Sequence, residues 1–239
     1  MNKITELSKK DLLSIRIVLD RSGSMSGSQK ITMQALNNYL KELKTEKGIN
    51  ASVTVSTFDS ISIDIPISRV SVKTLKSFPA DLLQPRGGTP LFDAIGLAIH
   101  DLENIIEATD DNKVLVIVTD GNENASKEYT FENISSKIKE KEEAGWLIIY
   151  LGADHDTFKQ SNSLNFNRER SMKYSKKDSV DTFKAVTRTT LDYSKGMKSK
   201  DIKFTEQERI YSDKPSVEKF ENYFQADAHV KAYRKLEEE

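Results

Sequence analysis

The sequence has no cysteine, only three histidines and a single tryptophan in 239 residues. Without cysteine there is no disulfide scaffold, no thiolate zinc site and no cysteine nucleophile. A histidine-rich catalytic metal centre is also disfavoured, because only His100, His155 and His229 are available. These absences remove most thiol and imidazole chemistry.

Long hydrophobic runs are missing as well. The longest, such as Leu147–Leu151, fall far short of the ~20 apolar residues that a membrane span needs. The first residues, Met1–Glu6, lack the basic and then apolar pattern of a secretory signal. We therefore expect a soluble, cytoplasmic protein that has no membrane partner.

The chain has no excess of either charge. Lys and Arg number 36 and Asp and Glu number 37, which gives a formal net charge of −1. Such a balance offers no global basic field for nucleic acid, so a nucleic-acid partner is not expected. Hydrophobic residues make up 37% of the sequence, which is enough to build one sizeable core.

Apolar runs alternate with helix-period segments along most of the chain. Buried strands are predicted at Leu12–Leu19, Ala51–Phe58, Val114–Val118 and Trp146–Leu151. Helices are predicted at about Gln29–Lys44, Leu91–Ala108, Thr130–Glu143 and Ser179–Ser194. This alternation predicts an α/β fold with a doubly wound, mostly parallel open sheet.

Two weaker segments complete a predicted sheet of six strands. Ser60–Val70 alternates apolar and polar residues and follows the second strand too closely for a crossover helix, so it is expected to be an antiparallel edge strand. Pro66 is tolerable at such an edge. Ser171–Ser175 is expected to form a short last strand.

The composition changes after Gly196, where mixed charge replaces clear periodicity. We expect one domain over residues 1–196 and a charged C-terminal tail or appended helix over residues 197–239. Within that tail, Val217–Leu236 is consistent with an amphipathic helix.

Polar side chains gather where the predicted strands end. In an open parallel sheet, ligands bind outside the carboxyl ends of the strands. Asp20, Ser22 and Ser24 follow the first strand, Thr89 precedes the second long helix, and Asp120 follows the strand at Val114–Val118. Two carboxylates and three hydroxyls suit a hard dication such as Mg²⁺. Because the hydroxyls neutralise none of its charge, the ion stays electrophilic and attracts a further anionic oxygen.

The pattern Asp20-x-Ser22-x-Ser24, then Thr89, then Asp120 resembles the metal-ion-dependent adhesion site (MIDAS) of von Willebrand factor A domains. The resemblance covers about residues 12–194. It implies that the three hydroxyls ligate Mg²⁺ directly, with Mn²⁺ or Ca²⁺ as alternatives, and that the two carboxylates complete the shell largely through water. It also implies a sixth position for a ligand from outside.

Two stretches, Thr119–Tyr129 and Trp146–Asp154, resemble intracellular bacterial and phage members of that family more closely than they resemble extracellular adhesins. The resemblance thus identifies a binding chemistry rather than a particular partner. It implies a protein partner that offers a Glu or Asp carboxylate.

Each candidate ligand also has a purely structural interpretation. The two aspartates favour turns after strands. Ser24 is a candidate N-cap for the helix that follows, and Thr89 is a candidate N-cap with Pro90 at the first helical position. Capping and metal ligation are not mutually exclusive at Thr89.

Several polar residues beside the candidate ligands have weaker assignments. By spacing, four of them are expected to point outward, either to contact a partner or to be solvated: Arg21, Arg86, Asn122 and Glu123. Asp59 ends the second strand at the same edge of the sheet; it is expected to be a hairpin turn residue, with a place in the outer shell around the metal as the alternative. Asp93 is expected to have a structural role in the first turn of its helix, where an acid meets the positive end of the helix dipole.

The leading hypothesis is a metal-dependent protein-binding module without catalysis of its own. One alternative is an adaptor subunit of a AAA+ ATPase or similar machine, suggested only by the segment after Gly196. The other is a metal-dependent phosphatase or hydrolase that uses Asp20. That enzyme hypothesis lacks support, because Ser22 stands where a haloacid-dehalogenase-type phosphatase has a second aspartate, and neither a phosphate-binding loop nor a nucleophile elbow is present.

Overall fold

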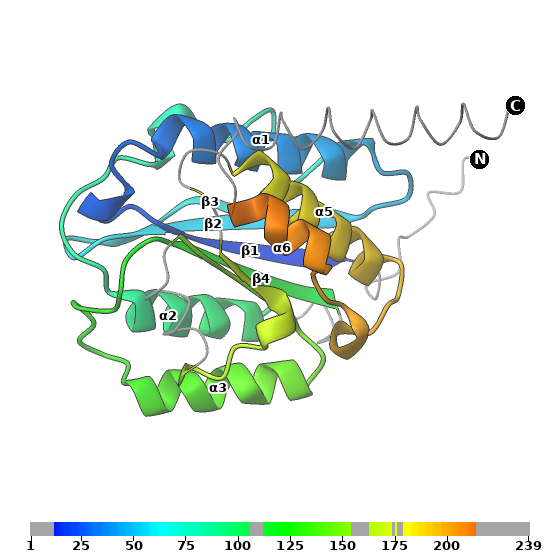
Figure 1. The fold of residues 1–239 in the computed structure, drawn as a ribbon. Coiled ribbons are helices and arrows are strands. Elements are labelled where there is room, and N and C mark those ends of the chain that lie inside the picture. The colour runs from blue at the N-terminus through cyan, green and yellow to red at the C-terminus, as the bar shows by residue number, and fades with distance from the viewer. Residues whose placement is uncertain (1–11, 106–111, 154–162, 174, 176–178, 214–239) are drawn as a thin grey trace, which may run out of the picture.

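The computed structural model describes residues 12–105, 112–153, 163–173, 175 and 179–213 (Figure 1). A sheet runs through it in the strand order β3-β2-β1-β4-β5-β6. The strands are β1 (Leu13–Asp20), β2 (Ala51–Phe58), β3 (Ile63–Ser71), β4 (Lys113–Thr119), β5 (Leu147–Gly152) and β6 (Ser171–Lys173). Every neighbouring pair is parallel except β2 and β3. The α/β prediction, with its antiparallel edge strand, is confirmed.

Helices cover both faces of the sheet. They are α1 (Gln29–Thr45), α2 (Leu91–Glu103), α3 (Phe131–Glu143), α5 (Val180–Ser194) and α6 (Glu206–Asp213). In Figure 1, α1, α5 and α6 lie on one side of the sheet and α2 and α3 lie on the other. Among the described residues, no helix has the length and apolar character needed to traverse a lipid bilayer.

The two core clusters explain why the central strands have continuous apolar runs. In β4, Val114, Val116 and Val118 belong to the cluster on the side of α1 and α5. The alternate residues Leu115 and Ile117 belong to the cluster on the side of α2 and α3. Because successive side chains point to opposite faces, a strand buried on both faces needs an apolar residue at every position.

The second predicted helix is shorter than expected. It ends at Glu103 rather than at Ala108, and the side-chain amide of Asn104 donates a hydrogen bond to the carbonyl of His100 (2.8 Å). A short amide side chain that bonds the local backbone in this way competes with further helical turns. Residues 106–111 lie outside the described part of the chain.

The chain after Gly196 packs against the domain as far as it is described. Ile202 and Phe204 are buried in the same core cluster as α1 and α5. Helix α6 then begins with a capping box, in which the Glu208 amide donates to the Thr205 hydroxyl and the Thr205 amide donates to the Glu208 carboxylate. That Thr-x-x-Glu pattern was the available signal for α6. The predicted helix at 217–236 lies outside the described residues, and the boundary at 196 stays a prediction.

Candidate metal centre

Three loops meet at the carboxyl ends of the central strands. The first loop (residues 21–28) follows β1, the second (83–90) precedes α2, and the third (120–130) follows β4. The Gly23 amide donates to the Gly87 carbonyl (3.0 Å) and the Asn124 amide donates to the Thr89 carbonyl (3.1 Å). Backbone hydrogen bonds therefore join the second loop to each of the other two.

The structure brings Ser22, Ser24 and Asp120 into direct contact. The Ser22 and Ser24 hydroxyl oxygens are 2.9 Å apart, and the Ser24 hydroxyl donates to Asp120 Oδ1 at 2.5 Å. These contacts link the end of β1 to the end of β4, two strands that are neighbours in the sheet. The sequence separation of Ser24 and Asp120 is 96 residues.

Gly121 makes room for the hydroxyl of Thr89. A Cβ atom at position 121 would lie 2.6 Å from Thr89 Oγ1 and 3.3 Å from Ser24 Oγ. The first distance is too short for a real contact, so any larger residue would force the Thr89 side chain to move. Thr89 and Ser24 thus point into the same small space, with the Gly121 backbone as its wall.

Asp20 lies at the end of β1 and is fully buried. Its Oδ1 accepts a hydrogen bond from the Ser22 amide (2.7 Å), and its Oδ2 accepts one from the Thr119 hydroxyl (2.6 Å). Burial raises the pKa of Asp20 to about 6; these hydrogen bonds lower it in part, and the nearby Asp120 charge raises it further. The site therefore concentrates negative charge in a poorly solvated place.

The composition of this cluster suits a hard cation. It consists of carboxylate and hydroxyl oxygens only, which are the donors that Mg²⁺ prefers. Asp20, Ser22, Thr89 and Asp120 are buried, whereas Ser24 is exposed, so solvent reaches the cluster from one side. Within the described ranges no group of three or more His, Cys, Asp or Glu residues is placed to hold a metal. A metal at this position would therefore depend on the hydroxyls, and the residues present fit such an ion.

The helix-capping alternatives for two of these residues are wrong. The N-cap of α1 is Ser28, and Ser24 lies in the short 3₁₀ turn Gly23–Met25. The N-cap of α2 is Pro90, one residue later than the alternative required. Thr89 is held instead by the third loop, because its amide donates to Asn124 Oδ1 (2.8 Å).

Arg21 was expected to point outward, and that expectation is wrong. Its side chain is 11% exposed and forms ion pairs with Asp59 and Asp64. The reason is that the β2–β3 hairpin stands beside the end of β1 and offers two carboxylates there. Arg86 is partly exposed, at 44%, but its Nε also donates to Asp59 (2.8 Å).

Asp59 confirms its expected turn role, because its Oδ1 accepts the amides of Ile61 and Ser62. Burial alone would raise the pKa of this carboxyl, but hydrogen bonds from Arg86, the Ile61 amide and Arg21 outweigh that effect and leave the pKa below its usual value. The carboxylate is therefore ionised across the ordinary pH range.

The third loop turns one of the expected outward residues inward. Glu123 accepts hydrogen bonds from the amides of Phe92, Ala125 and Ser126, so it organises the loop and the start of α2. Asn122 is exposed, as expected. Asp93 accepts amides from residues 127–129, which agrees with its expected structural role.

Two residues of the site escaped the sequence analysis. Thr119 donates to Asp20, and Asn124 accepts from the Thr89 amide. Both flank Asp120 in the run Thr-Asp-Gly-Asn-Glu-Asn, so their polar character beside a strand end was the available signal. Their partners, however, are distant in the chain.

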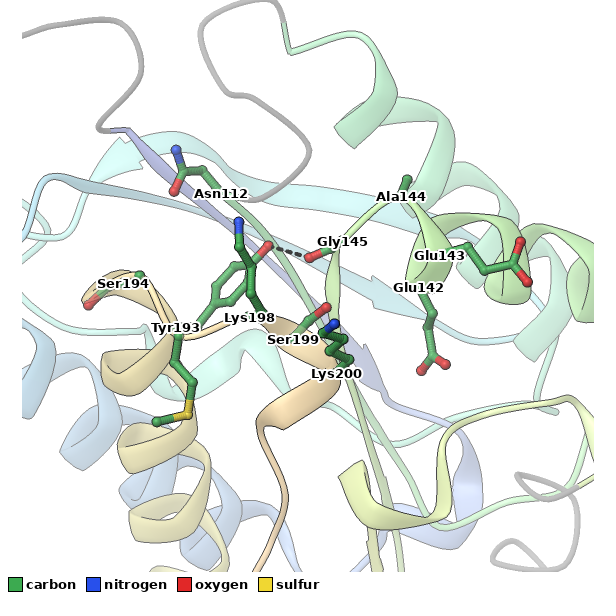
Figure 2. Close-up of a pocket in the computed structure, with 12 residues that line it drawn as sticks. Asn112, Glu142, Glu143, Ala144, Gly145, Tyr193, Ser194, Lys198, Ser199 and Lys200 are labelled. Carbon is green, nitrogen blue, oxygen red and sulfur yellow. Dashed lines mark hydrogen bonds between the residues drawn. The ribbon is translucent and has the colours of Figure 1, made fainter.

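A cavity of about 500 Å³ lies elsewhere (Figure 2). It is lined by residues such as Asn112, Gly145, Tyr193 and Lys198, and the Tyr193 hydroxyl donates to the Gly145 carbonyl (2.8 Å). Asn112 and Gly145 precede β4 and β5, so the cavity is at the amino ends of the strands. None of the five candidate ligands lines it, and it plays no part in the candidate metal centre.

The sequence matches one family model over β1 to β5 and the helices between them. The family model described as von Willebrand factor type A domain matches residues 13–159, more than half of the chain. The chain belongs to this family. No curated protein matches this von Willebrand factor type A domain at a significant level.

Solved structures share the fold at low sequence identity. The pilus adhesin SpaC from Lactobacillus rhamnosus GG has a TM-score of 0.60 at 15% identity, covering 79% of this chain and 31% of that one. The von Willebrand factor domain of the type V pili tip protein Mfa5 from Porphyromonas gingivalis has a TM-score of 0.56 at 10% identity, covering 75% of this chain and 95% of that one.

Proximal thread matrix protein 1 from the mussel byssus has a TM-score of 0.53 at 15% identity. The match covers 79% of this chain and 47% of the mussel chain, so this domain spans about half the length of that protein. Another structure of the mussel protein has a zinc-occupied MIDAS motif and a TM-score of 0.50 at 16% identity, covering 78% of this chain and 45% of that one. These likenesses concern the fold.

Proposed function

We propose that this von Willebrand factor type A domain is a divalent-metal-dependent protein-binding module. In this proposal the metal is held by Asp20, Ser22, Ser24, Thr89 and Asp120 as an intact MIDAS. The metal is Mg²⁺, with Mn²⁺ or Ca²⁺ as alternatives. When bound, the dication supplies an electrophilic position for a carboxylate oxygen from a Glu or Asp of a protein partner.

The contact between Ser24 and Asp120 carries the proposal. A hydroxyl and a carboxylate from separate loops lie 2.5 Å apart, with the Ser22 hydroxyl 2.9 Å from Ser24. Gly121 leaves space for the Thr89 hydroxyl on the same side. In this proposal the Asp20 carboxylate joins these four side chains around one small region, as an oxygen-ligated dication requires.

The division of labour among these residues follows from their surroundings. Asp20 is fully buried and already accepts two hydrogen bonds, so it is suited to fixing the first loop and to supplying charge at short range. Ser24 is exposed and marks the side from which a partner would approach. The zinc-occupied MIDAS of the mussel protein supports a divalent metal in this fold without indicating which ion this chain uses.

The alternative functions receive less support. A nucleophilic role for Asp20 is disfavoured because both of its carboxylate oxygens accept hydrogen bonds inside the protein. No described feature favours a AAA+ ATPase as the partner over any other protein. We also propose that the protein is of the intracellular bacterial or phage type and is located in the cytoplasm. This part of the proposal rests on the stretches Thr119–Tyr129 and Trp146–Asp154.

The experiment first measures binding of Mg²⁺ and Mn²⁺ to the full chain by calorimetry. The test variant is Ser24→Ala and the matched control is Ser26→Ala, since both remove one exposed hydroxyl from the first loop. We expect Ser24→Ala to weaken metal binding by at least about tenfold and Ser26→Ala to bind as the wild type does.

The second step tests partner capture. The immobilised chain is exposed to extract from its own organism in Mg²⁺ and in EDTA, with Ser24→Ala and Ser26→Ala in parallel. The proposal is supported by a partner that is retained only in Mg²⁺ and is lost with Ser24→Ala. The partner should also no longer bind when one of its own Glu or Asp residues is changed to the corresponding amide. Wild-type protein that binds no divalent metal, or a partner retained equally in EDTA, would contradict it.

A further inference from the structure

Asp59 occupies an unusual position between two of the metal-site loops. Its side chain has no exposed area, and one of its oxygens, Oδ2, accepts hydrogen bonds from two different arginines. Arg21 Nε is 2.5 Å away and Arg86 Nε is 2.8 Å away. Arg21 belongs to the first loop and Arg86 to the second, so a single carboxylate oxygen joins both.

The two oxygens of the Asp59 carboxylate make different contacts. Oδ1 accepts the amides of Ile61 (2.7 Å) and Ser62 (3.1 Å) and so forms the hairpin turn. Of the two Asp59 oxygens, only Oδ2 accepts from the guanidinium groups, which also share the Ser62 hydroxyl as an acceptor. A change that affects Oδ2 but leaves an acceptor at Oδ1 therefore separates the contact with the arginines from the turn.

Each arginine is close in the sequence to candidate metal ligands. Arg21 stands between Asp20 and Ser22, and Arg86 is three residues before Thr89. The Arg86 amide donates to the Arg21 carbonyl (2.8 Å), so the same two residues are also joined through the backbone. A displacement of either side chain is thereby transmitted to the main chain that carries the ligands.

We propose that Arg21, Asp59 and Arg86 form a positioning clamp that sets the separation of the first and second loops and thereby the metal affinity of the site. This inference rests on the proposed metal-binding function. In this proposal the three residues are not metal ligands. They act through the loop backbone, which holds Ser22 and Ser24 on one side and Thr89 on the other.

The charges of the cluster indicate that it acts on the metal site by positioning the loops rather than by its electrostatic field. Two arginines face two carboxylates, Asp59 and Asp64, so the cluster is neutral as a whole. A neutral cluster exerts little net force on a nearby dication. Its contribution to metal binding is then geometric, through the outer contacts that orient first-shell ligands.

The decisive variants separate geometry from charge. Asp59→Asn keeps an oxygen acceptor for the turn and places an amide donor against two guanidinium donors. Asp64→Asn is the matched control. It also removes one negative charge from the cluster, but Asp64 contacts Arg21 and not Arg86, so the link between the two arginines stays intact. Arg86→Gln removes a positive charge near the metal, which by charge alone would strengthen binding.

The full chain is titrated with Mn²⁺ alone, by calorimetry and by electron paramagnetic resonance, with folding of each variant checked by circular dichroism. We expect Asp59→Asn and Arg86→Gln each to weaken Mn²⁺ binding by about 10-fold to 100-fold. Asp64→Asn should stay within about threefold of the wild type, because a single half-exposed charge is well screened.

The outcomes distinguish the clamp from the metal site itself. Wild-type protein that binds no Mn²⁺ overturns the proposed function and the clamp with it. Wild-type binding together with unchanged affinity in Asp59→Asn overturns the clamp alone. Tighter binding by Arg86→Gln, or an equal loss in Asp64→Asn, assigns the cluster to electrostatics and also overturns the clamp. If Asp59→Asn does not fold, Arg86→Gln decides, since its side chain is partly exposed.

Discussion

Thr89 and Asn124 are joined by two hydrogen bonds that connect the second and third loops. The Thr89 amide donates to Asn124 Oδ1 (2.8 Å), and the Asn124 amide donates to the Thr89 carbonyl (3.1 Å). The residues are 35 positions apart, and neither hydrogen bond belongs to a helix or to the sheet. This pair fixes the backbone at Thr89 relative to the loop that carries Asp120.

Replacing Asn124 by alanine should loosen the Thr89 backbone. We expect the free energy of unfolding to fall by about 1 kcal/mol, because the Thr89 amide loses its acceptor. Metal affinity should fall by about tenfold, because Thr89 is no longer held in place. Chemical denaturation and calorimetry measure the two effects. The exposed neighbour Asn122→Ala should change stability by less than about 0.5 kcal/mol, and an equal loss there would contradict the prediction.

Metal should stabilise the folded chain by mass action. At a Mg²⁺ concentration about 100 times its Kd, the free energy of unfolding should rise by about 2.7 kcal/mol. In Asp20→Asn, a Kd raised tenfold or more reduces this gain to about 1.4 kcal/mol or less at the same concentration. Thermal unfolding with and without EDTA measures the difference. Asp81→Asn, an exposed carboxylate, should keep the full gain. The same gain in Asp20→Asn would argue against a role for Asp20 in the site.

Gly121 should not tolerate even one additional carbon. In Gly121→Ala the new Cβ would lie 2.6 Å from Thr89 Oγ1, so the hydroxyl must move away from the Ser24 side. We expect metal binding to weaken by at least about tenfold and stability to fall by about 1–3 kcal/mol from overpacking. Gly23→Ala is the control from the first loop, because its Cβ would meet the Gly87 carbonyl at an ordinary 3.5 Å. Titration of both variants with Mn²⁺ decides, and equal losses would rule out the steric explanation.

The attachment of α6 to α5 should depend on pH. Burial alone would raise the pKa of Glu208, but hydrogen bonds from Arg188 and from Thr205 outweigh it and hold the pKa below its usual value. A carboxyl with a lowered pKa in the folded state stabilises the protein above its unfolded pKa of about 4.5, and this contribution is lost as the pH falls through the folded value.

The variant Glu208→Gln tests that dependence. Its loss of unfolding free energy relative to the wild type should be clear at about pH 7 and should shrink as the pH falls through the lowered folded pKa of Glu208, where the wild-type carboxyl becomes protonated as well. Urea denaturation at the two pH values measures it. A difference between wild type and variant that does not change with pH would contradict the prediction.

Much of the fold followed from local patterns. The run Val114–Val118 predicted a strand buried on both faces, and β4 has that burial because its residues alternate between two core clusters. The short gap after β2 predicted an antiparallel edge strand, since no crossover fits in it, and β3 pairs in that way. The end of α2 and the existence of α6 were not predicted, because they depend on side-chain bonds at Asn104 and at Thr205.

The candidate site was likewise predictable in part. Their positions after strand ends were readable from the sequence, whereas the surroundings of Arg21 were not. Whether an arginine in a loop is solvated or buried depends on what stands next to it, and here a hairpin from residues 58–63 supplies Asp59. Asn124 and Thr119 were missed for a related reason, since each bonds a residue that is distant in the chain.

The sequence by itself determined the order of strands and helices and the oxygen-rich character of the loops, because hydrophobic periodicity and residue chemistry are local properties. Only the tertiary structure decided which oxygens face one another and which charges compensate one another. Ser24 meets Asp120, and Arg21 meets Arg86 across Asp59, because the crossovers of a parallel sheet bring distant loops to one edge.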